Sequence, residues 1–82
     1  LAQRLNDPRV FQPLLAPLQA MTRDRFFEAR ARAVRALGWI ALDYHSVAGS
    51  FQGLAFDSRW KVRVALIEGL HLLVDRGVLS AD

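Results

Sequence analysis

The chain of 82 residues repeats its own pattern, and this internal repeat constrains the fold more than any other feature of the sequence. After a shift of about 33 residues, Asp24 falls on Asp57 and Arg30 falls on Arg63. The same shift aligns three apolar pairs: Phe27 with Trp60, Leu37 with Leu70, and Ile40 with Leu73. In each unit a shorter helical pattern precedes a longer one. Such a unit cannot bury its apolar face alone, so neighbouring units must stack.

Helical spacing dominates the whole chain, and no run of residues alternates in the manner of a half-buried strand. The first helix is expected to be capped by Asn6 or Asp7, with Pro8 at its favoured first position. Pro13 and Pro17 fall within or near this helix and predict that it is kinked or split.

The second helix is expected to open at Asp24 and to run to about Leu42. Five residues at helical spacing form its predicted apolar face: Phe26, Ala29, Ala33, Leu37 and Ile40. On a helical wheel Arg30 lies on the apolar side, where an arginine is costly unless it is paired. Pairing with a carboxylate is therefore the favoured interpretation of Arg30, and anion binding is the alternative.

Two further helices follow in the second unit. Asp43 is expected to cap a short one, which Gly49 and Gly53 each weaken by up to about 1 kcal/mol relative to alanine. Asp57 is expected to cap a long one that ends near Gly77, a natural left-handed stop. The apolar positions of the two helices are Val47, Phe51, Leu54 and Ala55, then Val62, Leu66, Leu70 and Leu73.

The composition indicates one small domain, 1–82, with more apolar side chains than it can easily hide. Hydrophobic residues make up 52% of the sequence, which predicts an exposed apolar face for more chain or for another molecule. No cysteine is present, which excludes disulfides and thiolate metal sites and fits a cytoplasmic protein. The longest uncharged stretches, such as residues 36–42, are too short to span a bilayer, so we expect no membrane contact.

Two segments carry a resemblance to a known family. Leu14-Leu15-Ala16-Pro17-Leu18, Asp24 and residues 29–38 resemble one HEAT repeat, and residues 57–73 resemble the second half of another. The likeness covers about residues 10–75. It implies an all-α fold, an α-solenoid of about two antiparallel helix pairs with four to five helices. The units would be approximately 7–42 and 43–78, as part of a longer chain or assembly.

The resemblance also implies a structural role for two aspartates and two arginines. In HEAT repeats the aspartate caps the second helix and joins a ladder with arginines of neighbouring repeats. Carried over to this chain, the ladder residues are Asp24, Arg30, Asp57 and Arg63. The sequence departs from the family pattern at residues 43–56, where glycines stand in place of the usual helix formers.

A stripe on the second helix of each unit is the candidate surface for a partner protein. The stripes contain Glu28, Arg32, Arg35 and Trp39, then Lys61, Glu68 and Leu72. An exposed tryptophan beside arginines is a typical binding anchor, and the alternative is that Arg35 merely packs over Trp39. The resemblance implies that second helices line the concave, partner-binding surface. We therefore expect a protein-protein interaction or scaffolding module.

The aligned stripes reverse their charge between units. Glu28 aligns with Lys61 and Arg35 aligns with Glu68, so stacked helices would bring these two pairs face to face. Such pairing leaves less positive field for phosphates, although net charge is +3. Nucleic-acid binding through a basic concave surface therefore remains the alternative, and self-assembly into an oligomer is a third possibility.

The sequence has few patterns that are typical of catalytic sites, and those present are incomplete. Glu68 and His71 have the Glu-x-x-His spacing of di-iron ligands, but a second pair and further carboxylates are missing. His45 has no neighbouring glutamate. We therefore expect no enzyme activity, no metal, no cofactor and no small-molecule substrate.

Overall fold

The computed structural model describes residues 7–80, and this part of the chain is helical without any strand. The prediction of an all-α fold is confirmed. A 3₁₀ helix, η1, precedes four α-helices in the described residues. Their bounds are η1 Pro8–Leu14, α2 Leu15–Met21, α3 Phe27–Ile40, α4 Ala48–Leu54 and α5 Trp60–Asp75.

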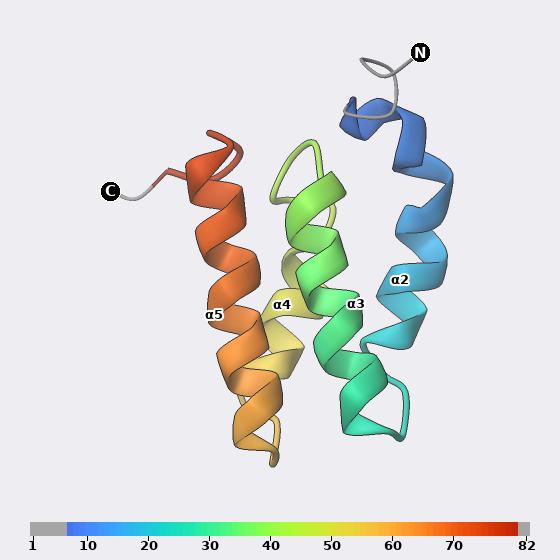
Figure 1. The fold of residues 1–82 in the computed structure, drawn as a ribbon, viewed down its shortest axis with the longest axis vertical. Helices are drawn as coiled ribbons and strands as arrows, with labels where there is room; N and C mark the ends of the chain where they lie inside the picture. The colour runs from blue at the N-terminus through green and yellow to red at the C-terminus, as the bar shows by residue number, and fades with distance from the viewer. Residues whose placement is uncertain (1–6, 81–82) are drawn as a thin grey trace.

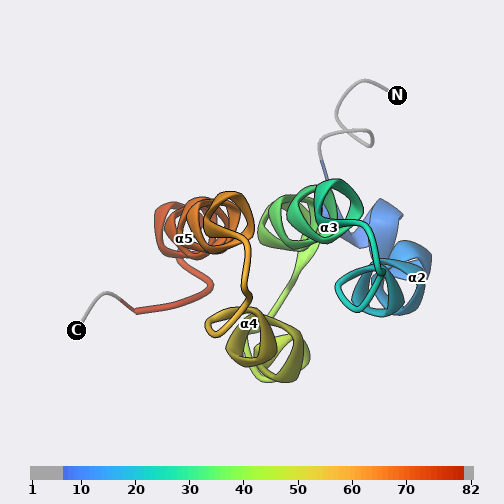
Figure 2. The ribbon, with the colours of Figure 1, turned by 90° about the horizontal axis from the view of Figure 1, so that it is seen from below.

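The helices form two layers (Figures 1 and 2). The two long helices, α3 and α5, lie side by side in one layer and run in the same direction. The short helices α2 and α4 lie in the other layer, and α3 and α5 make the most extensive contact between any two elements. The longer helix of each unit therefore belongs to one shared surface, which positions the candidate site.

The split of the first helix is confirmed. Asp7 accepts a hydrogen bond from the backbone N–H of Arg9 at 3.0 Å, and Pro8 occupies the first helical position. Pro13 lies inside η1, and regular α-helix begins only at Leu15. The proline lacks an N–H to donate to the preceding turn, which accounts for the tighter first segment. Asn6 lies outside the described residues.

Both long helices begin later than expected, because each aspartate caps the turn before its helix. The Asp24 carboxylate accepts from the N–H of Phe26 at 2.8 Å, and α3 begins at Phe27. The Asp57 carboxylate accepts from the N–H of Arg59 at 2.9 Å, and α5 begins at Trp60. Phe26 and Arg59, in extended backbone conformation, occupy the N-cap positions themselves.

The expected apolar face of α3 is wrong at its first residue. Phe26 is 58% exposed, because it precedes the helix and its ring lies against the guanidinium of Arg25. Ala33, Leu37 and Ile40 are buried as expected. Ala31, Val34 and Gly38 complete the buried face.

The second helix also ends earlier than expected, at Ile40 rather than Leu42. Its last carbonyls are taken by side chains from distant parts of the chain. Arg76 donates to the carbonyl oxygens of Gly38 and Ala41 at 2.7 Å each, and Gln12 donates to that of Ile40 at 2.8 Å. Burial of Arg76 lowers the pKa of its guanidinium from the usual value.

In the second unit, one predicted cap is wrong and one predicted stop is confirmed. Asp43 accepts from the N–H of Ser46 at 2.8 Å and so caps a turn, whereas α4 begins at Ala48. Gly77 has a φ of 76° after α5, and the N–H groups that follow it bond back to Leu73. This left-handed residue is the natural stop that its position indicated.

The long helices approach each other closely at two glycines. A Cβ added at Gly38 would lie 2.7 Å from the carbonyl oxygen of Gly69, and one at Gly69 would lie 2.9 Å from that of Val34. Phe51 of α4 packs beneath the same crossing, 3.2 Å from the position of a Gly69 Cβ. The two backbones are therefore in direct contact, above a core in which Phe51, Leu37 and Leu73 are the largest fully buried side chains.

Within residues 7–80, no helix has both the length and the apolar character needed to cross a bilayer.

Candidate functional site

The joined outer surface of α3 and α5, here called the α3–α5 face, carries two shallow pockets of about 300 Å³ each. The N-end pocket lies where both helices begin. It is lined by Phe27, Glu28, Ala31, Arg32, Arg35, Trp60, Lys61 and Val64. The C-end pocket lies farther along the helices. It is lined by Arg35, Trp39, Glu68, His71, Leu72 and Asp75.

All seven residues predicted to contact a partner line one of these two pockets. Glu28, Arg32 and Lys61 belong to the N-end pocket. Trp39, Glu68 and Leu72 belong to the C-end pocket, and Arg35 lines both. Residues four and seven positions apart on one helix share a side of it, so the periodicity of α3 and α5 produces this surface.

One ion pair divides the α3–α5 face. The Arg35 guanidinium and the Glu68 carboxylate approach to 3.1 Å, with both side chains about half exposed. This contact is the predicted register between the aligned stripes. Glu28 and Lys61 also face the same pocket, but no ion pair joins them among the described residues. An exposed pair of this kind contributes at most about 1 kcal/mol to stability.

Each pocket has one exposed tryptophan on its rim. Trp39 is 61% exposed and Trp60 is 62% exposed. The ammonium of Lys61 lies 5.7 Å from the centroid of the Trp60 ring. The face therefore combines large apolar side chains with cations, the residue types that are enriched where proteins bind one another.

Sequence reasoning missed Phe27, Trp60, Val64, His71 and Asp75 as parts of this face. Their signal was present in the helical spacing. Trp60, Val64 and His71 stand at spacings of four and seven on α5, beside the stripe that was chosen. The alignment of Trp60 with Phe27 drew attention to packing and away from the pocket that both residues line.

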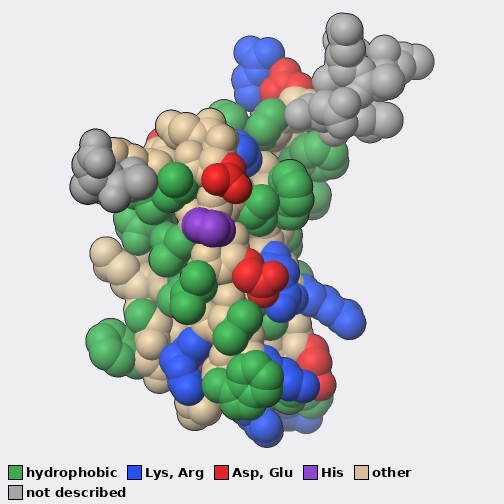
Figure 3. All heavy atoms as spheres, turned by 60° about the vertical axis from the view of Figure 1, so that its left-hand side comes forward, with side chains coloured by type: hydrophobic (Ala, Val, Ile, Leu, Met, Phe, Trp, Pro, Cys, Tyr) green, Lys and Arg blue, Asp and Glu red, His purple; other side chains and the backbone are tan. Residues whose placement is uncertain are grey.

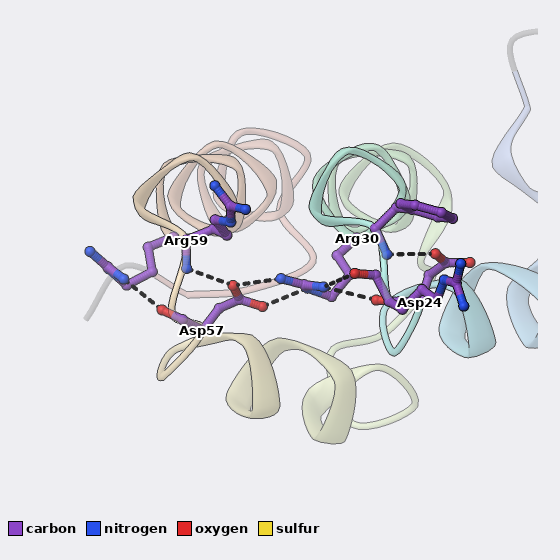
Figure 4. Close-up of polar contacts among 7 residues, drawn as sticks. Asp24, Arg30, Asp57 and Arg59 are labelled. Carbon is purple, nitrogen blue, oxygen red and sulfur yellow. Dashed lines mark hydrogen bonds and ion pairs between the residues drawn. The ribbon is translucent and has the colours of Figure 1, made fainter.

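Three of the candidate ladder residues, Asp24, Arg30 and Asp57, lie together at the start of the long helices (Figure 4), and the fourth, Arg63, contacts Asp57. Arg30 donates to both carboxylate oxygens of Asp57, at 2.7 and 3.0 Å, and to the backbone carbonyl of Asp24 at 2.9 Å. Arg63 donates to the backbone carbonyl of Asp57. Each arginine thus bonds the backbone of its own unit's aspartate, and Arg30 also binds the carboxylate of the next unit.

This pair is shielded from water. The side chains of Arg30 and Asp57 are 16% and 8% exposed. The hydrogen bonds from Arg30 lower the pKa of the Asp57 carboxyl, and the same contact raises the pKa of Arg30. Both guanidinium nitrogens on that edge are occupied, so Arg30 is not available to an external anion. Its geometry is that of a structural link between units.

Among the described residues, no group of three or more histidine, aspartate or glutamate side chains could hold a metal ion. His71 lines the C-end pocket, whereas His45 is exposed in the turn before α4. The Glu68 carboxylate, the other half of the Glu-x-x-His pattern, is bound by Arg35.

No protein-family model, no curated protein and no solved structure matches this chain.

Proposed function

We propose that this chain is a short HEAT-like helical repeat module that binds another protein on its α3–α5 face. The observation that carries the proposal is the pair of adjoining pockets, each with a tryptophan that is more than half exposed. The helices that form them touch through Gly38 and Gly69, so their backbones lie close together beneath this surface. Pockets with aromatic and arginine side chains favour recognition by surface complementarity.

Charge argues against a nucleic-acid partner. Arg30 is bound to Asp57, and Arg35 is bound to Glu68. Glu28 lines the N-end pocket beside the remaining cations, Arg32 and Lys61, and the carboxylates of Glu68 and Asp75 line the adjoining C-end pocket, which has no further cation. A phosphate backbone needs several unpaired cations along its path, and these acidic groups would repel it.

The test is a selection of binding peptides from a random displayed library, followed by mapping of the bound peptides by amide chemical shifts in the NMR spectrum. We expect the shifts to concentrate on α3 and α5, and Trp39→Ala to weaken binding at least tenfold. Arg23→Ala is the control, because Arg23 is exposed beside Gln19 and Ser46 on another surface. Peptides that map to α2 and α4, or a library that yields no binder, would remove the proposal.

Self-association is a second candidate function, favoured by one specific observation. Ile67 is 63% exposed, whereas Val34, which stands 33 positions earlier, is fully buried beneath the neighbouring helix. α5 thus presents to solvent the side that α3 presents to α5. Molar mass from light scattering, at low and high salt, decides this point: a dimer or larger species supports self-association, and a monomer at high concentration rejects it.

A further inference from the structure

The two pockets of the α3–α5 face differ in charge. Besides Arg35, which Glu68 neutralises, the N-end pocket is lined by two cations, Arg32 and Lys61, and by one carboxylate, Glu28. The C-end pocket has no further cation, only the Asp75 carboxylate and a histidine. The face is therefore polarised along the helices, positive where they begin and negative where they end.

The helix backbones add to this polarity. α3 and α5 run in the same direction, so their N-termini lie together at one end of the molecule (Figure 1). Each N-terminus carries roughly half a positive charge and each C-terminus the opposite. Figure 3 shows lysine and arginine side chains gathered among hydrophobic ones in the lower half of the molecule, where α5 begins. The side chains and the helix backbones thus both attract a negatively charged group to the end where α3 and α5 begin.

The shallow N-end pocket has apolar lining residues beside its cations. Ala31 is 6% exposed, and Phe27 and Val64 line the pocket beside it. Trp60 stands on the rim with most of its ring in solvent. A volume of about 300 Å³ is at the lower limit for small-molecule sites and suits one large side chain.

The two cations are available to a ligand. Neither Arg32 nor Lys61 forms an ion pair within residues 7–80, and the Lys61 ammonium lies over the Trp60 ring. Both can therefore bind a carboxylate without breaking an existing pair. A group that binds both cations and also covers the apolar lining residues must carry negative charge next to a large apolar side chain.

We infer that the N-end pocket takes a large apolar side chain from an acidic segment of the partner protein, whose carboxylates are bound by Arg32 and Lys61. This inference rests on the proposed function and specifies the chemistry of the partner. An acidic segment is favoured over a nucleic acid because its carboxylates can be confined to the N-end pocket. A continuous phosphate chain that followed the face would also meet the carboxylates of Glu68 and Asp75 in the C-end pocket.

The tryptophans allow the two pockets to be observed separately. The chain has two of them, so the two indole N–H signals in the NMR spectrum of the unchanged chain report the N-end pocket through Trp60 and the C-end pocket through Trp39. The probes are peptides selected from the random library, analogues with their acidic residues changed to amides, and single-stranded oligothymidylate. Affinity is measured by titration of the tryptophan emission.

We expect the selected peptides to contain acidic residues beside a leucine or an aromatic residue, and to shift the indole N–H signal of Trp60 more than that of Trp39. Arg32→Glu should weaken them tenfold or more, and the amide analogues should lose a similar factor. The matched control Arg23→Glu makes the same change of charge on another surface and should alter affinity less than threefold. Circular dichroism verifies that each variant is folded.

Three outcomes overturn the inference, and only the third also overturns the proposed function. Neutral or basic peptides that bind the α3–α5 face would leave that face as the binding surface but reject an acidic partner. Equal weakening by Arg32→Glu and Arg23→Glu would show that net charge alone governs affinity. Tighter binding of oligothymidylate than of any selected peptide, with the same dependence on Arg32, would identify a nucleic-acid site instead.

Discussion

Arg30 and Arg63 occupy the same place in two aligned units, yet their surroundings differ. Both donate to the backbone carbonyl of the aspartate six residues before them. Arg30 also binds the carboxylate of Asp57 from the following unit and is largely shielded from water. Arg63 is exposed and has no such carboxylate among the described residues. The comparison teaches that the role of each arginine depends on whether another unit packs beside it, although both arginines follow their aspartate at the same spacing of six residues.

The largest expected effect comes from removing the carboxylate that links the units. Asp57→Ala leaves Arg30 buried without its partner, which we expect to lower the free energy of unfolding by about 3 kcal/mol. Asp24→Ala removes only a capping bond to Phe26 and should cost about 1 kcal/mol. Urea unfolding followed by circular dichroism measures both. Equal losses of stability for the two variants would contradict the inference that Asp57 links the units whereas Asp24 only caps a turn.

The next effect concerns the helix contact that joins the units. Gly38→Ala places a Cβ 2.7 Å from a backbone oxygen of α5, so the helices must separate. We expect a loss of about 1–2 kcal/mol, after the gain in helix propensity is included. Gly49→Ala is the control, since a Cβ there meets no atom within 4 Å and should stabilise α4 slightly. A neutral Gly38→Ala would mean that the helices separate without cost.

Acid should weaken the shielded ion pair between Arg30 and Asp57. The hydrogen bonds from Arg30 hold the pKa of Asp57 below its usual value. The stability that this pair contributes is therefore fully present above the unfolded pKa of about 3.9 and is lost as pH falls through the folded pKa. Asp57→Asn should show a shallower loss of unfolding temperature below about pH 4 than the unchanged chain. Parallel acid profiles for the two proteins would show that other carboxyls dominate.

The smallest effect on stability is expected from the exposed arginine, Arg63. Arg63→Met removes one hydrogen bond to a carbonyl at the surface and should cost about 0.5 kcal/mol. Arg30→Met should cost several times more, since it leaves the Asp57 carboxylate unpaired in its shielded site. If Arg63→Met proved as damaging as Arg30→Met, Arg63 would have a second partner in solution. The molar mass of the unchanged chain would then identify a second copy as that partner.

The number of helices and their order could be predicted from the sequence, because periodicity and the proline and glycine positions are local signals. The start of α3 could not. Asp24 looks like an ordinary N-cap, but it caps the turn before the helix, and the choice depends on the packing of Phe27 and the hydrogen bonds of Arg30. The end of α3 depends on Arg76, which is too far away in sequence to be read as its cap.

The candidate face was predictable in part for the same reason. Helical spacing identifies which residues of one helix share a side, as for Arg32, Arg35 and Trp39. It does not say how far apart two helices stand, and the N-end pocket exists because Trp60 and Phe27 come from different helices. The alignment between units gave the Arg35–Glu68 contact, since it supplies the register that periodicity lacks.

The glycine contact between α3 and α5 also affects the entropy and the rate of binding at this surface. Because Gly38 and Gly69 bring two backbones into contact, the distance between the helices at this point does not depend on side-chain rotamers. A ligand that docks there does not need to move the two helices, and the main entropic cost on the protein side is the ordering of the exposed side chains that line the pockets. Its association rate would then be governed by diffusion and orientation, and competing ligands would differ chiefly in how long they stay bound.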